Sequence, residues 1–310
     1  RIIRGVKKQG GKKELLFNKT VALGRKKIEI GRLNLFEVVL NEILSVLVRK
    51  KIKYMFGGRL KALVSGGAPL NPDIGFFFMS LGLRILQGYG LTESAPVISV
   101  NRPSNVKIDT VGAPLNDVKI KIAKDGEILV QGELVMQGYW NDNQATNESI
   151  QNGWLHTGDI GHLDDMGRLV ITDRKKDIIV NSGGDNIAPQ RIEGILNLSP
   201  EISQAMIYGD KRPHLSAIVV PDDEWLDQWS SENGKPKELK FLHEDQELKK
   251  ALALVIEKIN SKLSNIEKIR HFIIAQTPFT IDNALMTPSM KIRRHKISAL
   301  YKNDLDQLYK

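Results

Sequence analysis

The segment Tyr89-Gly90-Leu91-Thr92-Glu93 carries three side chains that could contact one nucleotide. A tyrosine ring offers an apolar face to a purine, and a threonine hydroxyl can donate a hydrogen bond to a phosphate oxygen. A glutamate supplies the hard carboxylate oxygen that Mg²⁺ prefers. The same five residues also fit a capped turn, so they indicate a nucleotide site only in combination with other motifs.

A glycine-rich turn, Ser65-Gly66-Gly67-Ala68, follows a segment whose apolar residues predict a strand. Because glycine lacks a Cβ, the main chain of such a turn could approach a flat ligand closely. Taken alone, these residues are better explained by an ordinary turn between a strand and a helix. The turn is therefore a second weak indication of a ligand site.

Asp159 follows Gly158 within the segment from Trp154 to Ile160. After a tight glycine turn, its carboxylate could accept hydrogen bonds from both hydroxyl groups of a ribose. Capping of the turn itself is the alternative role.

Lys291 stands near the end of the chain in a basic cluster with Arg293, Arg294 and Lys296. A mobile ammonium group can neutralise the charge that develops when a carboxylate attacks a phosphate, since it can reach both anions. A solvated group of cations is the alternative for this cluster.

Two kinds of element must position these side chains in the first half of the chain. Asn34 and Glu37 predict a capping box before a helix over residues 35–44. A strand over 60–64 leads into the glycine turn, and Asn71 with Pro72 predicts the start of a helix that runs to Leu83. A strand over 84–87 then delivers the Tyr89 segment at its carboxyl end, where ligands bind in open α/β sheets.

A β-rich segment and a separate α+β unit are expected after this α/β layer. Residues 118–122 and 128–136 predict a hairpin around Asp125-Gly126, and residues 168–172 predict a further strand. We place the boundary between a first domain, 1–174, and a second domain, 175–310, in the charged run that follows. Residues 222–240 are polar and are expected to be loop-rich. The remaining elements expected in the second domain are strands at 178–180, 205–208, 216–220 and 272–274, and helices after Pro189 and over 244–263.

Composition excludes several classes of protein. The chain has 310 residues, 41% of them hydrophobic, which fits about two globular domains. With no cysteine, it cannot form disulfides, thiolate zinc sites or a thioester on the protein. The six histidines show no metal-binding spacing, and no G-x-S-x-G hydrolase motif is present. No segment resembles a signal peptide or a membrane span, and we expect a cytoplasmic protein.

The positive charge is concentrated at the start of the chain. Residues 1–61 contain 17 Lys or Arg and 4 Asp or Glu, a net charge of +13, whereas the whole chain carries +9. Such a block could face phosphates or the cytoplasmic face of an anionic membrane, or it could simply be solvated. Because aromatic residues are sparse there, single-stranded nucleic acid is not an expected partner.

Taken together, the motifs resemble the adenylate-forming (AMP-binding) superfamily of acyl-CoA synthetases, adenylation domains and luciferases. The resemblance implies an α/β layer and a small β-barrel from the large domain, followed by a small mobile α+β domain. It covers most of the chain, and chance agreement of all the motifs in register is below about one in a hundred. Besides the segments above, it rests on residues 132–140, 173–179, 182–193 and 285–294.

The resemblance implies a nucleotide site. Tyr89 would stack on adenine, Thr92 would contact the α-phosphate and Glu93 would hold Mg²⁺. Asp159 and Arg174 would bind the ribose. The other nucleotide-binding residues that it implies are Gly66, Gly67, Ala68 and Gly90.

It also implies residues for catalysis and domain motion. Lys291 would be catalytic together with Thr92 and Glu93, and deleting its ammonium group should cost on the order of 100-fold in the first reaction step. Lys176 would be the hinge about which the small domain turns between two half-reactions. Gly183 would lie along the path of pantetheine.

Residue 290 indicates the branch of the superfamily. Many members carry glycine directly before the catalytic lysine, whereas this chain has Met290, as in the long-chain fatty acyl-CoA synthetase variant. The expected reaction is ATP-dependent activation of a fatty acid to acyl-AMP and transfer to coenzyme A, with Mg²⁺ as cofactor. Asp185 fits less well, because an acid beside a phosphate and CoA path is electrostatically unfavourable.

Other functions remain open at this stage. One is a carrier-protein-loading adenylation domain, and another is a non-catalytic module that binds nucleotide or a membrane surface. The superfamily's Ser/Thr/Gly-rich loop for the β- and γ-phosphates is not found in residues 1–310. We therefore expect a fragment lacking an N-terminal part, and we expect that this chain alone does not activate fatty acids.

Overall fold

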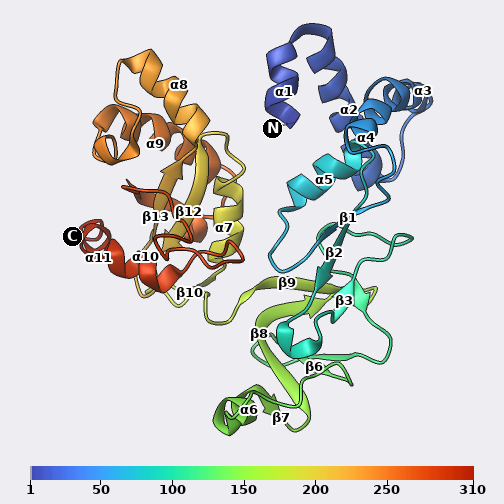
Figure 1. Cartoon of the computed structure of the whole chain (residues 1–310), viewed down its shortest axis with the longest axis vertical. Coiled ribbons are helices and arrows are strands. Elements are labelled where there is room, and N and C mark those ends of the chain that lie inside the picture. Colours follow the sequence, from blue (N-terminus) through green and yellow to red (C-terminus); the bar gives the residue numbers. More distant parts are fainter. Residues whose placement is uncertain (1) are drawn as a thin grey trace. The chain divides into compact units, whose positions relative to one another are not determined.

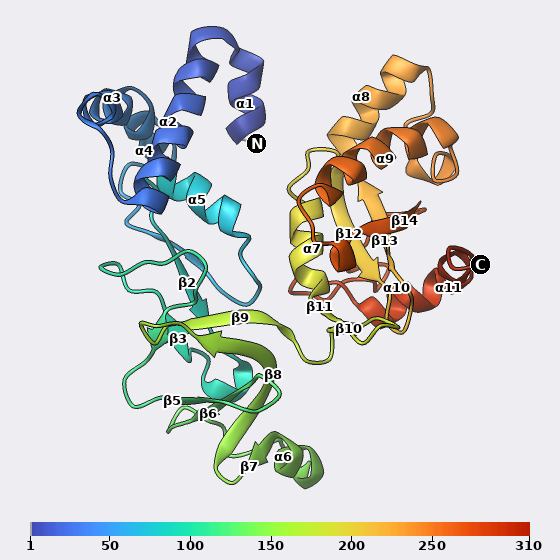
Figure 2. The ribbon, with the colours of Figure 1, turned by 180° about the vertical axis from the view of Figure 1, so that it is seen from behind.

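The structure is a computed structural model that describes residues 2–310. The chain forms two compact units, one ending at Ile171 and the other spanning Thr172 to Lys310. Figures 1 and 2 show the ribbon from opposite sides, with the first unit in blue to green and the second in yellow to red. Each unit has hydrophobic clusters of its own.

The first unit begins with helices that pack around Phe17, Ile52, Leu81 and Leu83. The predicted capping box is confirmed, since Asn34 Oδ1 accepts from the Glu37 backbone and the Glu37 carboxylate accepts from the Asn34 backbone. These helices are α1 (Ile2–Gln9), α2 (Gly11–Ile30), α3 (Leu35–Leu44), the π-helical turn η1 (Ser45–Arg49), α4 (Lys50–Met55) and α5 (Pro72–Ser80).

A small sheet follows the helices and contains the parallel pair predicted from the sequence. Its strands are ordered β1 (Leu63–Ser65), β2 (Ile85–Tyr89), β3 (Ser99–Val100) and β4 (Ala113–Pro114). Strands β1 and β2 run parallel, and both end at the same edge. Helix α5 begins where Asn71 and Pro72 predict, but it ends at Ser80, before the predicted Leu83.

The β-rich part of the first unit is a five-stranded sheet. The predicted hairpin is present, although its second strand ends at Gln131 rather than at residue 136. The strands are β5 (Lys119–Ile122), β6 (Glu127–Gln131), β7 (Ile150–Gln151), β8 (Trp154–Leu163) and β9 (Leu169–Arg174), with helix α6 (Asn143–Ser149) before β7. Strand β8 pairs with β6, β7 and β9.

The second unit is the expected α+β domain. A three-stranded sheet, β12–β13–β14, packs against helices around a core that includes Ile192, Leu215 and Leu252. Its elements are β10 (Ile179–Val180), β11 (Asn186–Ile187), α7 (Pro189–Leu196), β12 (Ile202–Tyr208), β13 (Leu215–Pro221), α8 (Asp223–Asn233), η3 (Leu239–Phe241), α9 (Gln246–Asn260), η4 (Asn265–Glu267), β14 (Ile269–Ile274), α10 (Arg294–Leu300) and α11 (Lys302–Gln307).

The loop-rich prediction for residues 222–240 is wrong over helix α8. Asp222 caps this helix by accepting from the Trp225 backbone, and Leu226 is buried in the core of the second unit. Trp225 and Trp229, one turn apart, stack on each other and pack against that core. Burial of a few large side chains thus outweighs the polar composition of the segment.

Among the described helices, none has both the length and the apolar character that crossing a bilayer requires.

Candidate active site

The glycine turn and the Tyr89 segment lie at the same edge of the parallel pair. Ser65 is opposite Gln87 in the register of β1 and β2, so each segment leaves its strand at the carboxyl end. Gly67 has a φ of 79°, a backbone conformation that side chains with a Cβ rarely adopt. A Cβ on Gly66 would lie 3.4 Å from the Gly88 carbonyl oxygen, so the turn packs closely beside β2.

Tyr89 and Asp159 meet in this region. The phenol of Tyr89 donates a hydrogen bond of 2.7 Å to Asp159 Oδ2. Only 8% of Tyr89 and 3% of Asp159 are exposed, and the tyrosine ring packs with Ile98 and Leu155. A base stacked on Tyr89 would therefore use a small remaining area of the ring, and the stacking role stays a prediction.

A bulge in β8 turns Asp159 toward Tyr89. Glu127 of β6 is opposite Ile160, whereas Leu129 is opposite His156, so extra residues of β8 lie between the two pairs. Gly158, with a φ of 69°, lies in this bulge. We expected a tight glycine turn here, but Gly158 lies within the continuous strand β8.

Glu127 holds the bulge through its carboxylate. Its Oε1 accepts from the Gly158 backbone at 2.9 Å, and its Oε2 lies 3.1 Å from His156 Nδ1. The Thr157 hydroxyl donates to the Ile128 carbonyl and accepts from the Asp159 backbone. These contacts fix the backbone on both sides of Asp159. Glu127 was not predicted as a site residue, although an acid at the start of the apolar run 127–130 was a usable signal.

The turn after β2 presents Thr92 and Glu93 on a short 3₁₀ helix, η2 (Thr92–Ser94). Gly90 is required before it, because a Cβ there would lie 1.6 Å from the Pro96 carbonyl oxygen. Thr92 is exposed and Glu93 is half-buried. The turn thus offers a hydroxyl and a carboxylate to solvent beside the glycine turn.

Tyr139 is a second contact residue that was not predicted from the sequence. Its phenol donates a hydrogen bond of 2.9 Å to Glu93 Oε1, and this bond to Glu93 raises the pKa of Tyr139. The backbone of the same segment contacts Glu93 as well, since the Met136 amide donates to the Glu93 carbonyl. Tyr139 lies inside the 132–140 motif, so the signal was present but unassigned.

The described residues contain no group of three or more His, Asp or Glu side chains placed to hold a metal ion. Glu93 alone still fits Mg²⁺, because this cation usually binds one or two carboxylates together with waters and nucleotide phosphates. The carboxylate of Glu93 is therefore compatible with its predicted role as a Mg²⁺ ligand.

The remaining predicted residues are numbered within the second unit, and they lie at the end of β9 or on three separate loops. Arg174 is the last residue of β9, Lys176 lies on the turn that follows, and both are exposed. The Arg174 carbonyl accepts from the amides of Asp177 and Ile178. Since the unit starts at Thr172, this turn connects β9 to the rest of the domain. That position suits a hinge.

Gly183 lies in the loop between β10 and β11. Asn181 Oδ1 accepts from the amides of Gly183 and Asp185, and Asn181 Nδ2 donates to Asp185 Oδ2 at 3.0 Å. Asp185 therefore closes the loop that presents Gly183. This contact gives the acid a structural role beside the predicted CoA path.

Lys291 ends a tight turn that begins at Thr287. The Thr287 hydroxyl accepts from the Lys291 amide at 3.0 Å, and the Lys291 carbonyl accepts from the Thr287 amide at 2.8 Å. Met290, directly before the lysine, has a φ of 61°. Lys291 is exposed on this turn.

Arg294 anchors the segment that follows Lys291. Its guanidinium forms a bidentate pair with the buried carboxylate of Glu193 in α7, at 2.7 and 2.5 Å. Burial alone would lower the pKa of Arg294, but the charges of Glu193 and Asp177 outweigh it and raise this pKa. Arg294 Nε also lies 3.9 Å from Asp177, next to Lys176. One arginine thus links the Lys291 turn to the hinge turn.

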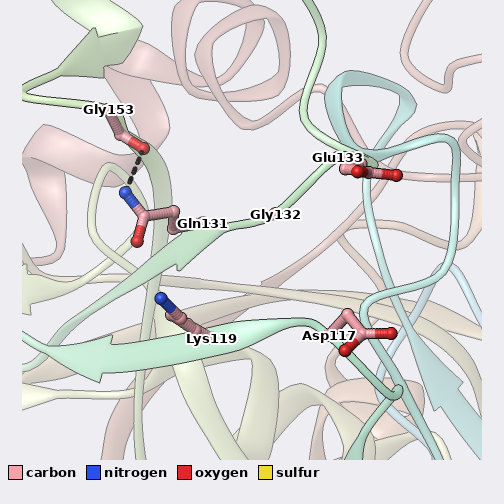
Figure 3. Close-up of a pocket in the computed structure, with 6 residues that line it drawn as sticks. All are labelled: Asp117, Lys119, Gln131, Gly132, Glu133 and Gly153. Atoms are coloured by element: carbon pink, nitrogen blue, oxygen red, sulfur yellow. Dashed lines mark hydrogen bonds between the residues drawn. The ribbon is translucent and has the colours of Figure 1, made fainter.

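A surface hollow of about 640 Å³ lies along β5 and β6 of the first unit (Figure 3). It contains two carboxylates and one ammonium group, and Gln131 donates to the Gly153 carbonyl at its rim. No predicted site residue belongs to it. Its lining residues are Asp117, Lys119, Gln131, Gly132, Glu133 and Gly153.

Two models of one enzyme family match this chain. The model described as AMP-binding enzyme matches residues 26–140, and that of the AMP-binding enzyme C-terminal domain matches residues 176–310. The chain belongs to the AMP-binding enzyme family. The superfamily resemblance of the motifs is thereby confirmed.

Relatives of this AMP-binding enzyme chain include long-chain fatty acid ligases. The long-chain-fatty-acid–CoA ligase FadD15 of Mycobacterium bovis is 39% identical over 265 residues, which are 85% of this chain and 44% of the relative. The long-chain-fatty-acid–CoA ligase 6 of Rattus norvegicus is 34% identical over 285 residues, 87% of this chain and 41% of the relative. The chain spans less than half the length of these relatives.

Solved structures of adenylate-forming domains share its fold. The A domain of carboxylic acid reductase from Segniliparus rugosus, in complex with AMP and a carboxylic acid, aligns with a TM-score of 0.69 and 24% identity over 95% of this chain and 46% of that one. The o-succinylbenzoate CoA synthetase of Bacillus subtilis, in complex with its acyl-adenylate, aligns with a TM-score of 0.61 and 25% identity, over 80% and 49% of the two chains. The predicted fold class is confirmed.

Proposed function

We propose that this chain forms the adenylate-handling part of a long-chain fatty acid–CoA ligase. The observation that carries the proposal is the buried contact between Tyr89 and Asp159, beside the glycine turn. It joins two separate family motifs at one sheet edge, where a ribose and an adenine can be held together. The names of the relatives support a fatty acid as the acyl substrate.

In the first proposed step, a fatty acid carboxylate attacks the α-phosphorus of ATP and pyrophosphate leaves. Thr92 donates a hydrogen bond to the α-phosphate, and Lys291 neutralises the charge shared by carboxylate and phosphate. Asp159 and Arg174 hold the ribose, while residues 66–68 and Tyr89 with Gly90 contact the base. Mg²⁺, held by Glu93 when bound, would neutralise phosphate charge.

In the second proposed step, the thiol of coenzyme A attacks the acyl carbonyl and AMP leaves. The second domain, 175–310, turns about Lys176 relative to the first domain, 1–174. Lys291 then withdraws from the adenylate, and Gly183 approaches the pantetheine arm. A glycine suits this role because it adds no side chain to the path.

The test is a ligase assay on the product of the complete gene, with ATP, Mg²⁺, CoA and a panel of fatty acids. Long-chain acyl-CoA formation supports the proposal. Transfer to a carrier protein in place of CoA, or Mg²⁺-dependent AMP binding without turnover, would establish one of the two alternatives. We expect the 310-residue chain assayed by itself to release no pyrophosphate, since the family's triphosphate loop is not found in residues 1–310.

We also propose that the basic start of the chain contacts anionic membranes at their cytoplasmic face. Leu35, Phe36 and Val39 are exposed on α3, and lysines lie on the neighbouring α4. Apolar side chains beside cations suit a lipid interface. Co-sedimentation with phosphatidylserine vesicles that weakens with salt supports this contact, and equal recovery with neutral vesicles contradicts it.

A further inference from the structure

We propose that Tyr139 is a positioning residue that orients the carboxylate of Glu93 toward a bound Mg²⁺. The inference rests on the proposed function, in which Glu93 is the metal ligand. Its direct support is the hydrogen bond of 2.9 Å from the Tyr139 phenol to Glu93 Oε1. The two residues are separated by 46 positions, so the contact is a product of the fold.

The direction of this hydrogen bond matters. A phenol has one proton to donate, and a carboxylate oxygen can accept it. Tyr139 therefore donates to Oε1 and holds one oxygen of Glu93. The carboxylate plane is then fixed before a cation arrives.

The segment that carries Tyr139 is itself rigid. The Tyr139 amide donates to the Thr146 hydroxyl at 2.9 Å, and that hydroxyl donates to the Asp142 carbonyl at 2.7 Å. Asp142 caps α6 by accepting from the Ala145 backbone. A Cβ on Gly138 would lie 2.8 Å from a Thr146 methyl group, so the turn is closely packed.

The backbone of this segment is also joined to the metal residue. The Met136 amide donates to the Glu93 carbonyl at 2.9 Å. The segment therefore holds Glu93 at the main chain and at the side chain. Partners of this kind raise metal affinity because they reduce the rotamers that a ligand must lose on binding.

The test compares Mn²⁺ binding, measured by electron paramagnetic resonance with ATP present, in the unmodified product of the complete gene and three variants of it. Tyr139→Phe keeps the ring but removes the donor, and we expect Mn²⁺ affinity to fall about tenfold. Glu93→Gln should abolish the same binding. Tyr54→Phe is the matched control, because it removes a phenol oxygen from a residue that is 81% exposed. AMP affinity without metal should be equal in Tyr139→Phe and the unmodified chain.

The outcomes separate this inference from the proposed function. Equal Mn²⁺ affinity in Tyr139→Phe and the unmodified chain, with weak binding by Glu93→Gln, overturns the role of Tyr139 alone. Unchanged binding by Glu93→Gln overturns the assignment of Glu93 and the inference with it. No detectable Mn²⁺–ATP binding by the unmodified chain contradicts both. A weaker AMP affinity without metal in Tyr139→Phe would show a general packing defect and overturn the positioning role.

Discussion

Tyr89 donates a 2.7 Å hydrogen bond to Asp159, a carboxylate 70 residues later in the chain. Both side chains are almost fully buried, so the contact forms away from bulk water. A carboxylate in such a place is oriented by its donors, and losing one donor leaves part of its charge uncompensated. The pair therefore contributes to the fold, and it also orients the carboxylate that we propose holds the ribose.

Two variants, Tyr89→Phe and Asp159→Ala, separate the contribution to stability from the proposed contribution to ribose binding. We expect Tyr89→Phe to lower the free energy of unfolding by about 2 kcal/mol, because a buried carboxylate loses a donor. Asp159→Ala should in addition weaken AMP binding at least tenfold, since it removes the group proposed to hold the ribose. Urea unfolding and calorimetry with AMP measure the two effects. Full AMP affinity in Asp159→Ala would refute the ribose assignment.

Met290 should be a strained position. Its φ of 61° is costly for a residue with a Cβ, by about 1 kcal/mol. We expect Met290→Gly to raise the free energy of unfolding by several tenths of a kcal/mol, because glycine's extra freedom in the unfolded chain offsets part of the relief. Met166 is a matched control, since it is 68% exposed and is not among the residues with positive φ. Met166→Gly should destabilise, and similar losses in both variants would rule out strain at Met290.

Lys291 should serve only the first half-reaction. In the product of the complete gene, Lys291→Ala should slow adenylate formation by about 100-fold or more, because a cation that neutralises two approaching anions is lost. The same variant should still convert supplied acyl-adenylate and CoA to thioester at a near-normal rate. Lys296→Ala is a suitable control, as it removes a cation from the same cluster. Equal loss in both half-reactions would contradict this division of roles.

Arg294 and Glu193 should behave as one unit in stability. Arg294→Met leaves a buried carboxylate without its cation, and we expect a loss of about 3 kcal/mol. The double variant Arg294→Met with Glu193→Leu should recover part of this loss, because neither charge is then buried alone. Thermal unfolding measures all three proteins. Additive losses in the double variant would show that the two side chains act independently.

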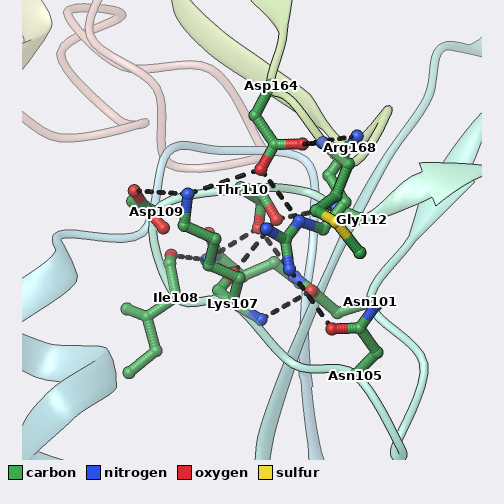
Figure 4. A network of polar contacts seen from close by, with 11 residues as sticks. Asn101, Asn105, Lys107, Ile108, Asp109, Thr110, Gly112, Asp164 and Arg168 are labelled. Carbon is green, nitrogen blue, oxygen red and sulfur yellow. Dashed lines mark hydrogen bonds and ion pairs between the residues drawn. The ribbon is translucent and has the colours of Figure 1, made fainter. Parts of the chain in front are cut away.

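Asp164 should make stability depend on pH in the acid range. Hydrogen bonds from the Arg168 backbone, and then from the Arg168 side chain, the Met166 backbone and Lys107, hold the pKa of Asp164 well below its ordinary value (Figure 4). A carboxyl group whose pKa is lower in the folded state stabilises that state above the unfolded pKa of about 4, and the contribution is lost as pH falls further.

The variant Asp164→Asn tests this pH dependence, because it removes the titrating carboxyl group. Its unfolding midpoint should lie below that of the unmodified chain from pH 7 to about pH 5. The difference should shrink as pH falls below about 4, where the aspartate becomes protonated. A difference that stays constant down to pH 2.5 would mean that charge on Asp164 does not stabilise the fold.

Local sequence determined the short-range features of this protein. The Asn34 and Glu37 capping box, the Pro72 helix start and the Asp125-Gly126 hairpin follow from groups within a few residues of each other. The edge that gathers residues 65–68 and 89–93 was also predictable, because both follow strands of a parallel pair. Backbone preferences act between residues that are close in sequence, so each of these patterns favours one local conformation.

Tertiary structure alone decided which distant groups meet. The register of β6 against β8 places a bulge at Gly158 and turns Asp159 toward Tyr89. The residues near Asp159 in the sequence do not indicate that Glu127 holds this bulge. The contact of Tyr139 with Glu93 depends in the same way on how two turns pack. Helix α8 forms because its apolar side chains find a core. Strand register and side-chain burial are set by the whole domain, because each depends on partners that lie far away in the sequence.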